Sequence, residues 1–178
     1  MQNNISVVII NGKPRSGKDT FCKYIEEYCE DLGKDCYTWS TIDNEKEILQ
    51  EWIKPYDSDG EWSDTDRAFL SDLKKLLNNY YDYTFDSFRA QMIFSTGIVL
   101  IHSREWEEIE RFKEYCNDNK IKCMTLFVRN DNLEKNYSNS SDMNCDENED
   151  KYDFHINNNG TLEELKENAR KFCDEELL

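Results

Sequence analysis

The segment from Ile5 to Gly33 restricts which folds this chain can adopt more than any other part of the sequence. Ser6-Val7-Val8-Ile9-Ile10 is a short apolar run, and such runs are typical of strands that are buried on both faces of a parallel sheet. A turn bounded by Gly12 and Gly17 follows, and apolar residues then recur at helical spacing until Gly33. The segment predicts a buried strand, a tight turn and a helix in direct succession.

The turn has the sequence Gly12-Lys13-Pro14-Arg15-Ser16-Gly17-Lys18-Asp19-Thr20, which fits the pattern G-x-x-x-x-G-K of a phosphate-binding loop. Glycines at both ends let backbone N–H groups point into one concavity, and the N-terminus of the helix adds partial positive charge. We expect Lys18 to bind the β- and γ-phosphates, with further charge from Lys13 and Arg15. The whole loop is therefore assigned to cofactor binding, with ATP as the cofactor.

Asp19 stands where a phosphate-binding loop normally has a Ser or Thr that gives its hydroxyl oxygen to Mg²⁺. A carboxylate can bind Mg²⁺ directly or through a water molecule, so Asp19 is the candidate metal ligand. An acid in the first turn of a helix is also favoured by the helix dipole alone. Both interpretations stay open at this point.

Strand and helix patterns alternate along the rest of the chain. Short strand-like runs occur at 36–39, 97–101, 121–128 and 152–156. Helices are expected at 18–32, 43–53, 84–94, from Ser63 to about Tyr80, through Ile109, Phe112 and Cys116, and after the capping box Thr161…Glu164. We expect one face of the first helix to carry Phe21, Ile25, Cys29 and Leu32, and the last helix to face the core with Leu162, Leu165, Ala169 and Phe172. The alternation predicts a three-layer α/β fold with a parallel sheet.

Length and charge narrow the organisation and the partners. The chain has 178 residues with a formal net charge of −16, and 13% of its residues are aromatic, which favours one folded domain over a solvated coil. Such an acidic surface repels phosphate backbones and anionic lipid, so neither nucleic acid nor a membrane is expected as a partner. The polar start of the chain and seven cysteines without a C-x-x-C pair favour a cytoplasmic protein with free thiols.

The loop resembles that of the nucleoside-monophosphate kinases. Pro14, Ser16 and Thr20 match adenylate kinases, and Ser16-Gly17-Lys18-Asp19 is similar to phage deoxynucleoside-monophosphate kinases and to animal-type phosphomevalonate kinases. The resemblance implies a single P-loop NTPase domain over 1–178, with a parallel five-stranded sheet, a helical acceptor-binding region at 40–95 and a lid-like polar loop at 130–150. It implies transfer of the γ-phosphoryl group of ATP, with Mg²⁺, to a small phosphorylated acceptor, for which we prefer a (deoxy)nucleoside monophosphate.

By the same resemblance, Lys46, Arg67 and Arg104 face the acceptor, and Arg129 at the base of the lid contacts the nucleotide. Together with Lys18 and Arg15, Arg104 is assigned to catalysis, because clustered cations stabilise a transferring phosphoryl group. Two features depart from the family. His102 stands where the strand should end in an acid that helps to hold Mg²⁺, and 130–150 contains no arginine.

These departures keep other functions open. A nucleotide-binding sensor with little or no kinase activity would show the same loop, and phosphomevalonate is an alternative acceptor. A guanine-specific switch is disfavoured because no N-K-x-D motif occurs. A structural protein that has lost the nucleotide is disfavoured by the intact Lys18. The oligomeric state is left open by the sequence.

Overall fold

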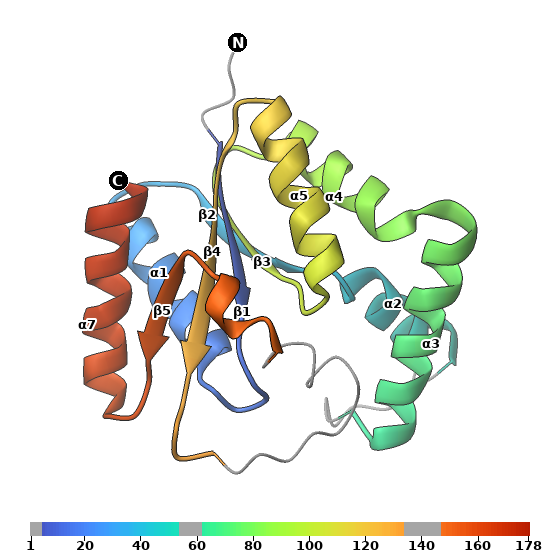
Figure 1. The fold of residues 1–178 in the computed structure, drawn as a ribbon, viewed down its shortest axis with the longest axis horizontal. Coiled ribbons are helices and arrows are strands. Elements are labelled where there is room, and N and C mark those ends of the chain that lie inside the picture. The colour runs from blue at the N-terminus through green and yellow to red at the C-terminus, as the bar shows by residue number, and fades with distance from the viewer. Residues whose placement is uncertain (1–4, 54–61, 134–146) are drawn as a thin grey trace. The chain divides into compact units, whose positions relative to one another are not determined.

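Five strands form one parallel sheet in the order β2-β3-β1-β4-β5 in the computed structural model, which describes residues 5–53, 62–133 and 147–178 (Figure 1). The strands are β1 (Ile5–Asn11), β2 (Cys36–Ser40), β3 (Gly97–His102), β4 (Lys122–Arg129) and β5 (Phe154–Asn157). The expected five-stranded parallel sheet is thereby confirmed.

The central strand β1 pairs with β3 on one edge and with β4 on the other. Val7 lies opposite Val99 in β3 and opposite Cys123 in β4. Its side chains from Val7 to Ile10 are completely buried. Burial on both faces explains why this strand is a continuous apolar run instead of an alternating pattern.

Helices cover both faces of this sheet (Figure 1). The helices are α1 (Lys18–Asp31) and α7 (Leu162–Phe172), which pack together, and α5 (Trp106–Asp118), which packs on β4. Phe21 and Ile25 of α1 and Phe172 of α7 share one core with Val8 and Leu100 of the sheet. Short helical turns lie at η2 (Glu149–Lys151) and η3 (Cys173–Leu177).

Two leucines expected on the apolar faces of helices are exposed, which corrects the prediction. Leu32 is 47% exposed and Leu162 is 60% exposed, whereas Leu165, Ala169 and Phe172 are buried as expected. Leu32 directly follows the last residue of α1, and Leu162 is the first residue of α7. Helical spacing predicts burial only where a neighbouring element continues alongside, and the residues flanking both leucines are exposed.

The chain divides into two compact units, one made of the residues up to Trp39 and from Ser95 onward, the other of Ser40–Phe94. The second unit contains α2 (Asp43–Ile48), the π-helical turn η1 (Leu49–Ile53), α3 (Asp64–Tyr81) and α4 (Tyr83–Phe94). Ser63 and Asp66 start α3 with a reciprocal capping box. This unit covers almost the same residues as the predicted helical region 40–95. None of the helices in the described ranges is long and apolar enough to cross a membrane.

The last strand begins two residues later than predicted, because Asp153 makes side-chain contacts at its start. Its Oδ2 accepts hydrogen bonds from the backbone N and the hydroxyl of Thr125 in β4, at 2.9 and 2.8 Å. Lys113 of α5 lies 3.2 Å from the same oxygen. Partial burial by itself would raise the pKa of Asp153, but the bonds from Thr125 and Lys113 outweigh it and lower the pKa. Asp153 thus ties β5 to β4 and α5.

We predict that Asp153→Asn lowers the free energy of unfolding by about 1–2 kcal/mol at pH 7, since it removes charge-assisted hydrogen bonds. A carboxyl with a lowered pKa in the folded chain contributes fully above its unfolded pKa of about 3.9, and the contribution is lost as pH falls through the folded pKa. Urea unfolding from pH 7 to pH 3 measures this. The difference in free energy of unfolding between wild type and variant should narrow below about pH 4. A difference that does not depend on pH would contradict the assignment, and so would an equal loss in the control variant Asp72→Asn, at an exposed position.

Candidate functional site

The loop between β1 and α1 lies at the carboxyl end of the central strand, where parallel α/β sheets bind ligands. Asn11 holds its start, since the side-chain Oδ1 accepts from the backbone N of Gly12 at 2.8 Å. The backbone N of Ser16 donates to the carbonyl oxygen of Lys13 at 3.0 Å and closes the turn. Arg15 and Gly17 have φ angles of 66° and 91°, so the chain curls tightly before α1 begins at Lys18.

Gly12 is required by a close approach of two backbone segments. A Cβ atom there would lie 2.5 Å from the carbonyl oxygen of Val128 in β4 and 2.6 Å from Oγ of Ser16. Gly17 is in the left-handed region and directly precedes α1, with the side chain of Asn158 against it. Both glycines therefore allow the backbone to follow the tight path of the loop, as the motif predicts.

Asn158, in the turn after β5, joins three segments that are far apart in the sequence. Its side-chain amide donates to the carbonyl oxygen of Ser16 at 2.8 Å, and its backbone N donates to the carbonyl oxygen of Arg129 at 2.7 Å. The sequence predicts a turn at 157–160 but gives no sign that one of its asparagines supports the phosphate-binding loop. Only the pairing of β5 with β4 brings them together.

The loop fits a phosphate group in its charge and in its unused donors. Within the described part of the chain, the hydroxyl of Ser16 is buried and has no hydrogen-bond partner. The side chain of Lys18 is only 12% exposed, and its Nζ lies 3.0 Å from Oδ2 of Asp19. A buried donor without an acceptor, a partly buried ammonium group and a helix N-terminus together suit an anion.

Asp19 lies within a cluster of cationic and imidazole side chains at the start of α1. Its Oδ1 is 3.4 Å from Nδ1 of His102, the last residue of β3. Burial by itself would raise the pKa of Asp19, but the ion pair with Lys18, and then His102 and Arg104, outweigh it and lower the pKa. The structure thus brings Lys18, Asp19 and Arg104 together, and the carboxylate stays ionised. An ionised carboxylate that is 74% exposed fits a divalent cation.

His102 also contacts Cys22, one turn further along α1. Nε2 of His102 lies 3.1 Å from Sγ of Cys22. Burial raises the pKa of the Cys22 thiol to about 12. His102 therefore connects two residues of α1, a contact that the sequence does not reveal.

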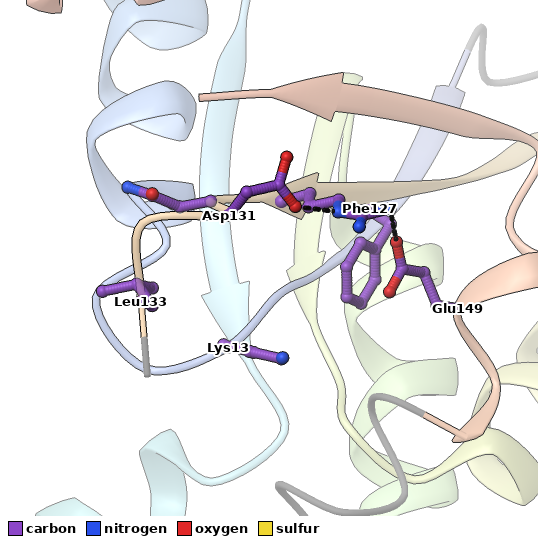
Figure 2. Close-up of a pocket in the computed structure, with 7 residues that line it drawn as sticks. Lys13, Phe127, Asp131, Leu133 and Glu149 are labelled. Carbon is purple, nitrogen blue, oxygen red and sulfur yellow. Dashed lines mark hydrogen bonds and ion pairs between the residues drawn. The ribbon is translucent and has the colours of Figure 1, made fainter. Parts of the chain in front are cut away.

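Arg129 lies in a pocket of about 190 Å³ beside the loop (Figure 2). The pocket is lined by Lys13, Phe127, Arg129, Asn130, Asp131, Leu133 and Glu149. Arg129 is bound by two acids, because its Nε donates to Asp131 and its Nη1 lies 3.2 Å from Oε1 of Glu149. A hydrogen bond from Asn159, together with Arg129 and Lys13, lowers the pKa of Asp131. The sequence predicts Arg129 but not the two carboxylates that hold it.

Lys46 and Arg67, the other expected acceptor-binding residues, belong to the second unit. Nζ of Lys46 lies 2.8 Å from Oδ1 of Asp43, and Oδ2 of Asp43 accepts from the backbone N of Ser40 at 2.7 Å. Arg67 is exposed on α3. Their role in binding stays a prediction. Most of the expected lid at 130–150 lies outside the described residues, which end at Leu133 and resume at Glu147.

Several solved structures, kinases among them, resemble this chain over nearly its whole length. The APS kinase of Mycobacterium tuberculosis in complex with AMPPNP and APS has a TM-score of 0.52 and 15% identity, over 96% of both chains. The tunicamycin resistance protein of Deinococcus radiodurans has a TM-score of 0.53 and 12% identity, over 97% of this chain and 96% of that one. A putative kinase from Chloroflexus aurantiacus has a TM-score of 0.50 and 9% identity, over 98% of both. The chain has the fold of the P-loop kinases.

The expected P-loop kinase fold is thus confirmed, whereas the more specific resemblance to nucleoside-monophosphate kinases stays a prediction. The sequence matches no protein-family model and no curated protein.

We predict that Gly12→Ala lowers the free energy of unfolding by about 1–3 kcal/mol, because the added methyl group meets the backbone of β4. Urea unfolding measures the loss. Gly33→Ala is the matched control, since Gly33 has a φ of +65° but nothing within 4 Å of an added Cβ, and it should lose only about 1 kcal/mol. Equal losses in the two variants would show that the close approach at Gly12 is not what requires glycine.

Proposed function

We propose that this protein is an ATP-dependent kinase that transfers the γ-phosphoryl group to a small phosphorylated acceptor, with a (deoxy)nucleoside monophosphate as the acceptor. The observation that carries the proposal is the loop Gly12–Thr20, in which a tight backbone turn, a buried hydroxyl without a partner and a partly buried lysine meet at the N-terminus of α1. The kinase fold supports the same assignment.

In this proposal the chain acts by positioning and by charge. The phosphates of ATP are held by backbone N–H groups of 12–17, by the hydroxyl of Ser16 and by Nζ of Lys18. To bind them, Lys18 gives up its ion pair with Asp19. Mg²⁺, when bound, neutralises negative charge on the phosphates, and Asp19 is the residue that would hold it. Arg15 and Arg104 stabilise the charge on the transferring group. Arg129, held by Asp131 and Glu149, contacts the nucleotide from the side of the loop.

Lys46, Arg67 and Arg104 are proposed to bind the phosphate of the acceptor. A monophosphate carries about two negative charges, and several cations are needed to bring it beside ATP. In the second unit, Asp43 holds Lys46, while the guanidinium of Arg67 stands on an exposed face of α3. Phosphomevalonate is an alternative acceptor, and so is APS, because the M. tuberculosis neighbour binds it.

A nucleotide-binding sensor without kinase activity is the second candidate. It is favoured by His102, which ends β3 where the related kinases have an acid. Turnover that depends on an acceptor distinguishes the two functions, since a sensor binds ATP without it.

We predict that one acceptor raises ADP release from ATP·Mg²⁺ well above the background without acceptor. A coupled assay over nucleoside monophosphates, deoxynucleoside monophosphates, phosphomevalonate and APS identifies it. Lys18→Ala should lower kcat by about 100-fold or more, because it removes a charge that stabilises the transferring group. Lys23→Ala, which removes an exposed lysine from the same helix, is the control. ATP binding without stimulation by any acceptor would contradict the kinase and favour the sensor.

Arg104→Lys is expected to raise KM for the acceptor roughly tenfold or more, because lysine cannot replace the paired N–H donors of a guanidinium. KM for ATP should change little. Initial rates at varied acceptor and ATP concentrations separate the two effects. The control is Arg170→Lys, on the exposed side of α7 near Asp174. A larger change in KM for ATP than for the acceptor would move Arg104 to the nucleotide side.

A further inference from the structure

Three side chains of the first unit are in contact in the order Cys22, His102, Asp19. Asp19 and Cys22 are three residues apart on α1, so they lie on the same face of the helix. The imidazole of His102, at the end of β3, contacts both: Nδ1 is 3.4 Å from Oδ1 of Asp19 and Nε2 is 3.1 Å from Sγ of Cys22. His102 is only 16% exposed on its side chain. The proposed function gives no role to His102 or Cys22.

The contact with Cys22 can fix which nitrogen of a neutral imidazole carries the proton, because a thiol 3.1 Å from Nε2 can donate to it. Cys22 is 2% exposed, and burial keeps its thiol protonated at neutral pH. When the protonated thiol donates to Nε2, a neutral imidazole carries its proton on Nδ1, the nitrogen that faces Asp19. Nδ1 of His102 lies 3.4 Å from Oδ1 of Asp19. The imidazole therefore lies between the thiol and the carboxylate and contacts both.

Asp19 has a free choice of rotamers unless something holds it, since its side chain is 74% exposed. Lys18 contacts Oδ2, but in the proposed function Lys18 turns to the phosphates and releases that oxygen. His102 is then the contact that keeps the carboxylate in place. Imidazoles and carboxylates behind a metal ligand commonly fix its orientation, and their loss typically costs about 10–100-fold in metal affinity.

We propose that His102 is a positioning residue that orients the carboxylate of Asp19 toward the Mg²⁺ of bound nucleotide, and that Cys22 sets the tautomer of His102. The inference rests on the proposed function, because it needs a nucleotide with Mg²⁺ at the loop. It gives the histidine at the end of β3 a part in metal binding without making it a ligand, since Mg²⁺ prefers oxygen. The carboxylate is supplied by α1, and the strand orients it.

The test measures the affinity for AMPPNP by calorimetry, once in excess Mg²⁺ and once in EDTA. The ratio of the two dissociation constants is the contribution of the metal. His102→Gln places its amide near the position of Nε2 and leaves Asp19 without a donor, so the ratio should fall about tenfold while the affinity in EDTA changes less than about twofold. His102→Asn places an amide nitrogen near the position of Nδ1 and should recover part of the ratio. A merely structural role of His102 would change the affinity in EDTA as well.

A double-mutant cycle shows whether His102 acts through Asp19. Asp19→Asn should lower the ratio by itself, and adding His102→Gln should lower it no further, because the oriented carboxylate is already absent. Independent losses that multiply would overturn the inference. So would equal losses in His102→Gln and His102→Asn, which would indicate a direct role of the ring.

The role of Cys22 is tested by a second matched pair. Cys22→Ser keeps a donor to Nε2 and should keep most of the metal contribution, whereas Cys22→Ala removes the donor and should lower the ratio. Equal ratios in these two variants would overturn the role of Cys22. Thermal unfolding followed by circular dichroism verifies that each variant is folded.

His155→Gln is the control, because His155 is the other histidine of the chain and is exposed on β5. Its ratio should equal that of wild type.

Failure of the proposed function can be distinguished from failure of this inference. If wild type does not bind AMPPNP under either condition, the nucleotide site and this inference both fail. If wild type binds AMPPNP and Asp19→Asn lowers the ratio but His102→Gln does not, the inference alone fails.

Discussion

The complete burial of residues 7–10 in β1 is the constraint on which the site depends. Because β3 and β4 bond to its two edges and helices cover both faces, its side chains from Val7 to Ile10 have no contact with solvent. The chain must leave this strand at the centre of the sheet and turn at once into α1. Gly12 passes between the backbone of β4 and the side chain of Ser16, where an added Cβ atom would force one of them to shift. The position of the loop between β1 and α1 thus follows from how the core is packed.

A second constraint is the net charge of −16, which requires phosphate to be held by local cations. Several cations assigned to the site are paired with carboxylates of the chain: Lys18 with Asp19, Lys46 with Asp43, and Arg129 with Asp131 and Glu149. Binding a phosphate at Lys18 therefore exchanges one anion for another. The gain in free energy is the difference between the two contacts, so nearby acids tune affinity as directly as the cations do.

The sequence predicts the fold closely because most of the relevant signals are local. Apolar runs, helical spacing and the capping box at Thr161 depend on residues near one another, and the strands and helices lie where these patterns place them, with β5 two residues late. The loop motif is local too. What the sequence does not reveal depends on pairing over long distances: Asn158 reaches Ser16 only because β5 lies beside β4, and Glu149 reaches Arg129 from 20 residues further along the chain. The exposure of Leu162 likewise depends on where neighbouring elements end.

The histidine at the end of β3 can be interpreted only together with the residues that it contacts. Taken alone, His102 indicates the loss of a metal ligand, and Asp19 indicates an unusual loop or an ordinary helix cap. The structure puts the two side chains in contact, with the imidazole on the carboxylate and a buried thiol behind it. The end of β3 lies beside the end of β1, from which the loop leads to Asp19 at the start of α1. If Asp19 holds Mg²⁺ as proposed, the two departures are one exchange, in which the helix supplies the ligand and the strand supports it.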